Sequence, residues 1–338
     1  MKIVFFGSDD FAQRHLEALV TSHNVLACVT QPDKPKGRGM KVVESPIKIT
    51  AQKNKIPVLQ PTVLTEQSFI DTLKKYNADL FVVIAYGRIL PSAVLKIPKL
   101  FPLNVHGSLL PRYRGAAPIN WAIMNGDKKT GITIMKLNEQ MDAGDIIEQM
   151  TLDIAPIDDA QMLREKMMQA GPTFLLTTLE KIAANRYQPK KQDMKEVTLA
   201  PKLTKELGKI DWNKSAVEIH NLVRGLIPWP TAYTTIIELP LNKQNSKTLA
   251  IVDDPGESFR VREGKLNKEK TLKILLSQVV SHKATTPGQI IALSKEGILV
   301  SCRDQALLAQ RVQPQDGKPM DAHAFVIGHK LKIGDSLG

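Results

Sequence analysis

Three apolar runs near the N-terminus most constrain the fold of this chain. Residues 2–6 (KIVFF), 25–29 (VLACV) and 79–85 (DLFVVIA) are rich in β-branched and aromatic side chains, which do not alternate with polar ones. This pattern is typical of strands covered on both faces, as in a parallel sheet. A helical spacing follows the first run at residues 11–19, and another precedes the third run at residues 66–76. The N-terminal half therefore predicts a doubly wound α/β domain.

Further segments extend this domain. Residues 103–106 and 131–137 have the composition of strands, and residues 160–184 have the spacing of a helix that would close the domain. Ser8 or Asp9 stands directly before the first helical pattern, where a side-chain oxygen can accept a hydrogen bond from a free backbone N–H. We therefore expect a strand, a loop and a capped helix in this order.

The first loop argues against two large groups of nucleotide-binding proteins. It reads GSDD at residues 7–10 and lacks the G-x-G-x-x-G spacing with which dinucleotide-binding domains approach a pyrophosphate. The phosphate-binding sequence G-x-x-x-x-G-K-[S/T] does not occur in the chain. Neither a dehydrogenase nor a nucleoside triphosphatase is indicated.

The C-terminal part has a different pattern. The composition changes near residue 190, and a helical pattern covers residues 215–226. Beyond it, short strand-like segments alternate with turns, which favours a small β-barrel of the OB kind. The expected strands are residues 271–280, 287–291, 297–302 and 307–312.

The expected organisation is a doubly wound, mostly parallel α/β domain followed by a small OB-like β-barrel domain. We assign residues 1–189 to the first domain, residues 190–208 to a linker and residues 209–338 to the second domain, with an insertion within residues 241–270. A length of 338 residues with 43% apolar content is enough for one large and one smaller core.

Cysteine content and hydropathy indicate the compartment. Cys28 and Cys302 are the two cysteines, so neither a disulfide framework nor a thiolate metal site is expected. No stretch approaches the ~18 consecutive apolar residues of a membrane span, and the sequence enters a strand at Lys2 without a signal peptide. These features predict a soluble cytoplasmic protein without a membrane partner.

The charge of the chain points to its partners. A formal charge of +12 favours a polyanion such as a nucleic acid, although basic proteins can also be merely well solvated. Residues 31–48 form a basic loop with five basic and two acidic side chains among three prolines and two glycines. Taken alone it reads as a solvated surface loop, but it follows the second strand directly, on the ligand side of the sheet.

Asn104 and His106 form the strongest candidate for a catalytic site. In an extended segment the two side chains leave the same face, roughly 7 Å apart along the strand. Asn supplies an amide donor that does not titrate, and His carries a proton near neutral pH. Asp142, in the run MDAGD at residues 141–145, could orient or charge the imidazole. The three side chains together suit acyl or formyl transfer.

The sequence Asn-x-His at a strand end is more often a hydrogen-bonded terminus than a catalytic site. Its neighbours favour a site here, because Gly107 frees the backbone and the following SLLP, residues 108–111, forms a rigid turn. Loops at strand ends are where α/β sheets bind their ligands. We therefore expect a ligand pocket at this end of the strand.

These residues resemble the folate-dependent formyltransferases, and the whole chain resembles the methionyl-tRNA formyltransferase family nearly end to end. The most specific segment is NVHGSLLPRYRGAAPI at residues 104–119, paired with MDAGD at residues 141–145. The segments QPDKPKGRG (31–39), KIDW (209–212) and VQP (312–314) resemble those of the tRNA-directed members. The resemblance implies transfer of the formyl group of 10-formyltetrahydrofolate to the amino group of initiator methionyl-tRNA, by a monomer and without a metal.

The resemblance also implies roles for single residues. By position, Asn104, His106 and Asp142 match the catalytic trio of the family. The residues that match its folate-binding positions are Ser108, Leu109, Leu110, Pro111, Ile89 and Leu90. The residues that match its tRNA-binding positions are Lys34, Lys36, Arg38, Lys41 and Lys202. For Lys202, a solvated surface lysine is a comparably good interpretation.

Two features depart from the family pattern. The first loop carries Asp10, where the family commonly has Thr-Pro-Asp or Thr-Pro-Glu after the glycine, so we expect this loop to be shaped differently. Residues 241–270 are longer than is usual in the family, which leaves the start of the β-barrel open. Neither departure touches the trio.

Three alternative functions remain open on the sequence. The same trio could formylate a small amine, such as glycinamide ribonucleotide or an amino sugar nucleotide, although a linked basic β-domain argues against this. Water could replace the amine, which would make the chain a formyltetrahydrofolate hydrolase. The chain could also be a noncatalytic RNA-binding protein on a formyltransferase scaffold, which the intact trio argues against.

Overall fold

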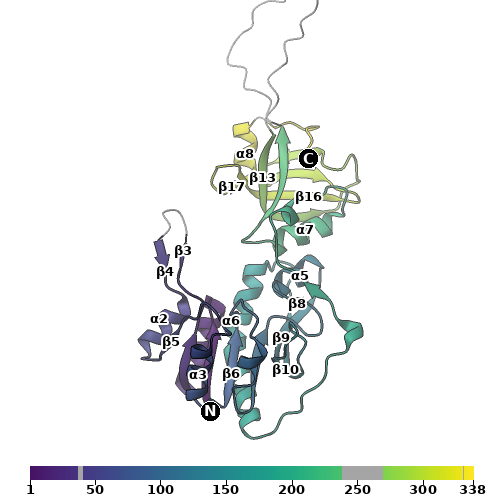
Figure 1. The fold of residues 1–338 in the computed structure, drawn as a ribbon. Coiled ribbons are helices and arrows are strands. Elements are labelled where there is room, and N and C mark those ends of the chain that lie inside the picture. Colours follow the sequence, from purple (N-terminus) through teal and green to yellow (C-terminus); the bar gives the residue numbers. More distant parts are fainter. Residues whose placement is uncertain (37–40, 238–268, 330) are drawn as a thin grey trace, which may run out of the picture. The chain divides into compact units, whose positions relative to one another are not determined.

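The computed structural model describes residues 1–36, 41–237, 269–329 and 331–338. The chain divides into two compact units, Met1–Leu203 and Thr204–Gly338 (Figure 1). The domain limits expected from the sequence stay a prediction. The expected insertion, residues 241–270, lies outside the described residues up to position 268.

The first unit is built on one seven-stranded sheet. In spatial order its strands are β10 (Ile146–Asp153), β9 (Lys129–Lys136), β7 (Phe101–His106), β6 (Leu80–Ile84), β1 (Lys2–Gly7), β2 (Asn24–Val29) and β5 (Val58–Leu59). The five strands from β7 to β5 are parallel, whereas β9 runs antiparallel to both of its neighbours. The predicted mostly parallel sheet is confirmed, with an antiparallel β9 that the sequence did not distinguish.

Helices cover both faces of this sheet, which is why its central parallel strands β6, β1 and β2 are apolar without alternation. They are α1 (Asp10–Ser22), α2 (Pro46–Lys53), α3 (Gln67–Lys75), α4 (Ser92–Leu95), α5 (Pro118–Met124) and α6 (Ala160–Ala183). Within β1, Ile3 and Phe5 enter a core with α1 and α6, whereas Val4 and Phe6 enter a second core with α3 and α4. The doubly wound architecture is therefore confirmed, with one core on each face.

The predicted helix start after the first strand is confirmed at Asp9. The Asp9 side chain accepts a hydrogen bond from the backbone N–H of Ala12 at 3.0 Å, as an N-cap residue does. Within the described part of the basic loop, β3 (Lys34–Lys36) pairs antiparallel with β4 (Lys41–Val43) and forms a hairpin with it. This hairpin extends away from the sheet of the first unit (Figure 1).

The second unit is a small antiparallel β-domain, as the run of short strands predicted. Its sheet has the order β12 (Ala232–Ile237), β13 (Glu269–Val280), β16 (Ala306–Pro314), β15 (Gly297–Ser301) and β14 (Ile290–Ser294), and β17 (Met320–Asp321) pairs with β16. Two helices, α7 (Ala216–Gly225) and α8 (Ala322–His329), accompany the sheet. Ser215 and Glu218 form a capping box at the start of α7. Both helices contribute apolar side chains to the core of this unit.

The segment after α6 returns to the sheet of the first unit. Ile146 and Lys190 exchange two backbone hydrogen bonds of 2.8 Å, and β11 (Leu199–Ala200) pairs in parallel with β8 (Arg114–Gly115). A short 3₁₀ helix, Met194–Glu196, lies between these pairings, and a second one, Glu206–Gly208, begins the other unit. Residues 190–200 are therefore folded against the first unit, close to the loop that follows β7.

Candidate active site

Strand β7 brings Asn104 and His106 to the edge of the sheet where the parallel strands end. Asn104 pairs with Val83 of β6 and Met135 of β9, and His106 is the last residue of β7. The His106 ring is buried, whereas Asn104 is partly exposed. Among the described residues, no hydrogen-bond partner of the Asn104 amide is found. The Asn104 amide is therefore a donor that a ligand at this edge can use.

The turn between β9 and β10 brings Asp142 to His106. The Nδ1 atom of His106 lies 3.7 Å from Oδ2 of Asp142, and both side chains are largely buried. The other ring nitrogen, Nε2, lies 2.9 Å from the carbonyl oxygen of Tyr113. Because a carbonyl only accepts, Nε2 carries a proton in both charge states of the ring. Nδ1 is therefore the nitrogen that gains or loses a proton, and it faces the carboxylate.

Asp142 is held in an uncommon backbone conformation. Its φ is +52°, in the left-handed region that few residues other than glycine adopt. Its Oδ2 accepts a hydrogen bond of 2.9 Å from the backbone N–H of Gly115. At Gly144, two residues on, a Cβ would collide with the carbonyl oxygen of Lys136, so only glycine fits. The MDAGD run is thus shaped to aim one carboxylate at His106.

The turn formed by Ser108, Leu109, Leu110 and Pro111 is fixed by a network of side-chain hydrogen bonds. Thr133 of β9 is its centre: the Thr133 hydroxyl donates to the Ser108 carbonyl at 2.6 Å and accepts from the Leu110 N–H at 3.1 Å. Gln149 of β10 donates to the Leu110 carbonyl at 2.8 Å and to the Thr133 hydroxyl at 2.9 Å. Ser108, Leu110 and Thr133 are buried. The Leu110–Pro111 peptide bond is cis.

The other two residues expected to contact folate differ in their exposure to solvent. Ile89 and Leu90 lie in the loop after β6, where Ala85 and Gly87 have positive φ values of 45° and 76°. Ile89 is 63% exposed, whereas Leu90 is 5% exposed and packs in the core beside α3 and α4. Ile89 is therefore open to contact with a ligand. Leu90 instead anchors the loop in the core of the first unit.

The expected tRNA-binding residues that the structure describes lie in β3, in β4 and near the end of the first unit. Arg38 lies outside the described residues. Lys34 and Lys36 lie in β3 and Lys41 lies in β4. Lys202 is exposed at the end of the first unit.

The base of the β3–β4 hairpin is clamped by Lys48 of α2. The Lys48 ammonium lies 2.5 Å from the carboxylate of Asp33, which precedes β3, and 2.8 Å from that of Glu44, which follows β4. Gln60 donates a further hydrogen bond of 2.8 Å to Asp33. The hydrogen bond from Lys48 holds the pKa of Asp33 below its usual value. The start and end of the hairpin are thus tied to one helix.

The first loop is stapled to α6 through Asp10. Arg164 lies 2.6 Å from Oδ1 of Asp10 and 3.0 Å from Oδ2 of Asp9. The hydrogen bond from Arg164 lowers the pKa of Asp10, whereas burial raises the pKa of Asp9. The residue that departs from the family pattern therefore supplies a second carboxylate to an ion pair between α1 and α6.

The sequence did not reveal one residue of this site, Gln192. Its side chain donates to the carbonyl oxygens of Asp142 and Gly144, both at 2.8 Å, and accepts two hydrogen bonds from Arg114. Gln192 lies in the segment that its composition predicts to be a linker. No motif could have pointed to it, because its contacts arise only when residues 190–200 fold back on the loop after β7.

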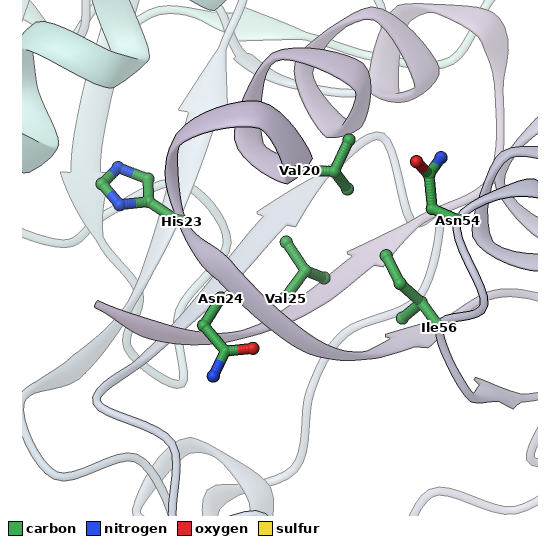
Figure 2. Close-up of a pocket in the computed structure, with 6 residues that line it drawn as sticks. All are labelled: Val20, His23, Asn24, Val25, Asn54 and Ile56. Carbon is green, nitrogen blue, oxygen red and sulfur yellow. The ribbon is translucent and has the colours of Figure 1, made fainter.

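A separate small pocket lies at the end of the sheet where the parallel strand β2 begins, opposite the end that carries His106. It has a volume of about 200 Å³, and Figure 2 shows the side chains around it. They are Val20, His23, Asn24, Val25, Asn54 and Ile56. Burial lowers the pKa of His23, whose Nε2 has no hydrogen-bond partner among the described residues. This pocket contains none of the expected site residues.

Within residues 1–36, 41–237, 269–329 and 331–338, no group of three His, Cys, Asp or Glu side chains could hold a metal ion. In the same ranges, no helix is both long enough and apolar enough to cross a membrane. Cys28 and Cys302 are free thiols, and burial raises the pKa of each to about 12.

Comparison with known proteins identifies the class that this fold and site define. The family model described as formyl transferase matches residues 1–179, and the model of the formyl transferase C-terminal domain matches residues 202–330. The methionyl-tRNA formyltransferase of Clostridioides difficile (strain 630) is 41% identical over 340 residues, with both chains covered completely. That of Geobacter sulfurreducens is 38% identical over 339 residues, which cover 100% of this chain and 97% of the relative. The chain belongs to the methionyl-tRNA formyltransferase family and is an enzyme that transfers formyl groups.

Solved structures share the fold. An N-formyltransferase from Helicobacter canadensis, in complex with folinic acid and dTDP-3-aminofucose, has a TM-score of 0.60 at 18% identity and covers 91% of this chain and 98% of its own. HypX from Aquifex aeolicus, in complex with tetrahydrofolic acid, has a TM-score of 0.60 at 17% identity and covers 99% of this chain and 48% of its own. At these identities the likeness supports the two-unit fold.

Proposed function

We propose that the chain transfers the formyl group of 10-formyltetrahydrofolate to the α-amino group of initiator methionyl-tRNA, giving N-formylmethionyl-tRNA for translation initiation. The observation that carries the proposal is the convergence of His106 and Asp142 at the end of the strand that also bears Asn104. The names of the full-length relatives support the tRNA acceptor. The tetrahydrofolate and folinic acid bound to proteins of the same fold support a folate donor.

The reaction needs little from the enzyme beyond positioning and charge stabilisation. The neutral α-amine attacks the formyl carbon, and a tetrahedral oxyanion forms. The bond from the formyl carbon to N10 of the folate then breaks, and the proton lost by the amine passes to N10. This scheme uses neither a metal nor a covalent enzyme intermediate. Holding both substrates in register can offset roughly 7–11 kcal/mol of a bimolecular barrier.

Each residue of the trio has a separate role in this scheme. The Asn104 amide and the Nδ1–H of protonated His106 donate hydrogen bonds to the oxyanion. The 3.7 Å between Nδ1 and the Asp142 carboxylate is longer than a direct hydrogen bond, so the Nδ1–H is left for the substrate oxygen. The carboxylate lies beside the ring and orients the imidazole. A water beside Asp142 can carry the proton from the amine to N10.

Folate and tRNA contact different parts of the first unit in this proposal. The folate lies against the turn formed by Ser108 to Pro111 and against Ile89, whose exposed side chain offers apolar contact. The basic hairpin, with Lys34, Lys36, Arg38 and Lys41, contacts the acceptor stem of the tRNA, and Lys202 meets its phosphates. The positive charge of +12 favours such a partner.

The direct test is transfer of a labelled formyl group from 10-formyltetrahydrofolate. The acceptors are methionyl initiator tRNA, uncharged initiator tRNA and glycinamide ribonucleotide, each in a separate reaction. We expect product on the methionyl amine only. Product only on the ribonucleotide, or free formate without any acceptor, would keep the trio and overturn the tRNA assignment. Absence of transfer to every acceptor would remove the catalytic role.

A further inference from the structure

Gln192 lies between a buried cation and the turn that carries Asp142. On one side, Arg114 donates to the Gln192 Oε1 from Nε at 3.0 Å and from Nη2 at 2.8 Å. On the other side, Nε2 of Gln192 donates to the carbonyl oxygens of Asp142 and Gly144, both at 2.8 Å. Arg114 is 8% exposed. One side chain thus joins β8 to two backbone positions of the MDAGD turn.

The chemistry of the partners allows only one orientation of this amide. A guanidinium can only donate, so it must face the Gln192 oxygen, and backbone carbonyls can only accept, so they must face the nitrogen. Both N–H groups of the amide and its oxygen are then used. The buried positive charge of Arg114 also polarises the amide, which strengthens its donation to the two carbonyls. The contact therefore depends on an amide at this position rather than on any polar side chain.

Strand β8 holds Asp142 by two routes. Arg114 acts on the Asp142 backbone through Gln192, and the next residue, Gly115, donates its N–H to the Asp142 carboxylate at 2.9 Å. Within this turn Asp142 has a positive φ, a backbone conformation that an isolated chain seldom adopts. The Gln192 hydrogen bonds offset the cost of this conformation at the two carbonyls that flank Ala143. The distance from Asp142 to His106 therefore depends on Gln192.

We propose that Gln192 is a positioning residue for formyl transfer, which fixes the Asp142 turn so that its carboxylate faces Nδ1 of His106. This proposal rests on the proposed function insofar as Asp142 serves the reaction. Gln192 contacts neither the reacting groups nor His106, so it acts through Asp142. A displacement of a catalytic group by about 1 Å can lower a rate by 10²-fold, which sets the scale of the effect.

The main test replaces Gln192 with Glu, which keeps the length of the side chain and an acceptor for Arg114. Gln192→Glu replaces the donating N–H groups with a carboxylate oxygen, which the two carbonyl oxygens repel, and keeps the pairing with the buried guanidinium. We expect kcat to fall by about 10- to 10²-fold while KM for both substrates changes less than about threefold. Full activity of Gln192→Glu would overturn the proposal. Gln169→Met is the matched control, because Gln169 is exposed on α6 and hydrogen-bonds Glu165.

A double-mutant cycle separates positioning from general support of the fold. If Gln192 acts through Asp142, adding Gln192→Glu to Asp142→Ala should lower kcat no further than Asp142→Ala alone. A residue that only supports the fold would lower activity by the same factor in both backgrounds. Equal factors would therefore overturn the proposal.

Hydrogen exchange of the free enzyme tests the clamp without any substrate. We expect the backbone amides of residues 141–145 to exchange at least about tenfold faster in Gln192→Glu than in the parent chain, with no change in Gln169→Met. Unchanged exchange in Gln192→Glu would overturn the clamp. If the parent chain fails to formylate methionyl-tRNA, the proposed function fails, but this measurement still decides whether Gln192 holds the Asp142 turn.

Discussion

The Nε2 atom of His106 donates a hydrogen bond of 2.9 Å to the carbonyl oxygen of Tyr113, and this contact decides which ring nitrogen can act on a substrate. Because Nε2 is tied to an acceptor in both charge states, the change of protonation falls on Nδ1, beside Asp142. The site therefore works through Nδ1, with the carboxylate behind it and the Asn104 amide on the same strand.

Two replacements of His106 test this assignment. The amide nitrogen of Asn lies near the position of Nδ1, whereas that of Gln lies near the position of Nε2. We expect His106→Gln to lower kcat by roughly 10²–10³-fold, the usual loss for one oxyanion donor. His106→Asn should retain about tenfold more activity than His106→Gln, because it keeps a donor where the oxyanion forms. Steady-state formylation kinetics measure both values. Greater activity of His106→Gln would assign the catalytic role to Nε2 instead.

Asn104 is expected to contribute one donor to the oxyanion. Asn104→Ala should lower kcat by about 10²–10³-fold, while the dissociation constant of the folate changes little. The loss falls on kcat because the hydrogen bond strengthens as charge develops on the formyl oxygen. Single-turnover formylation with saturating donor measures this step. Unchanged turnover of Asn104→Ala would remove the residue from the mechanism.

The fold and the placement of Asn104 and His106 on one strand could be predicted because both depend on local pattern, whereas the catalytic role of the trio stays a prediction. Unalternating apolar runs mark strands that are buried on both faces, and Asn104 and His106 lie two residues apart on one strand, so their common side follows from the strand period. Strand β10 was not among the expected strands, and its sequence, IIEQMTLD, has polar side chains between the apolar ones, unlike the unalternating runs of the parallel strands. The antiparallel direction of β9 has no local signature either.

The hydrogen bonds that hold His106 and Asp142 in place could not be predicted, because their partners are backbone groups and a side chain from a distant segment. The Tyr113 carbonyl and the Gly115 N–H are present in every peptide and carry no signal in the side-chain sequence. Gln192 is 50 residues from Asp142 and 78 from Arg114 along the chain. Its role depends on the return of residues 190–200 to the first unit, which a composition typical of a linker did not suggest.

Thr133 is expected to hold the turn against which the folate lies. Thr133→Val removes the hydroxyl that serves Ser108, Leu110 and Gln149, and leaves buried polar groups without their partner. We expect a loss of roughly 1–3 kcal/mol in the free energy of unfolding and a higher KM for the folate. Thr133→Ser keeps the oxygen and should restore the KM. Urea denaturation and donor titration measure the two effects. A normal folate KM in Thr133→Val would show that this network does not shape the folate site.

Lys48 is expected to prepare the basic hairpin for tRNA. Lys48→Met breaks the ion pairs to Asp33 and Glu44, so the ends of the hairpin are no longer tied to α2. Ordering the hairpin must then be part of binding, and we expect the dissociation constant of methionyl-tRNA to rise about tenfold with the folate constant unchanged. Filter binding at several salt concentrations should show an unchanged salt slope. Arg38→Ala should instead lower the slope by about one, because it removes a phosphate contact. A lower slope in Lys48→Met would mean that Lys48 itself contacts the tRNA.

His15 is expected to make the first unit less stable in weak acid. Its Nδ1 donates to the Phe11 carbonyl at 2.8 Å, its Nε2 faces Gly171 without a hydrogen-bond partner among the described residues, and burial lowers the pKa of the ring to about 4. A histidine in the unfolded chain has a pKa near 6.5, so between these values the unfolded state binds the extra proton. The contribution of neutral His15 to the free energy of unfolding is therefore fully present above about pH 6.5 and is lost as the pH drops toward 4. At pH 5 the expected loss is about 2 kcal/mol relative to pH 7.

The matched variant for this effect is His15→Asn, whose amide nitrogen lies near the position of Nδ1, so that it keeps a donor for Phe11 and does not titrate. The free energy of unfolding from urea denaturation is measured at pH 7 and pH 5 for both chains. Other titrating groups, such as Asp9 and Asp10, act equally in the two chains, so the difference between the two pH dependences isolates His15. We expect the parent chain to lose about 2 kcal/mol more than His15→Asn between these pH values. Parallel pH dependences would show that His15 accepts a proton in the folded state as readily as in the unfolded chain, and that its surroundings near Gly171 admit the charge.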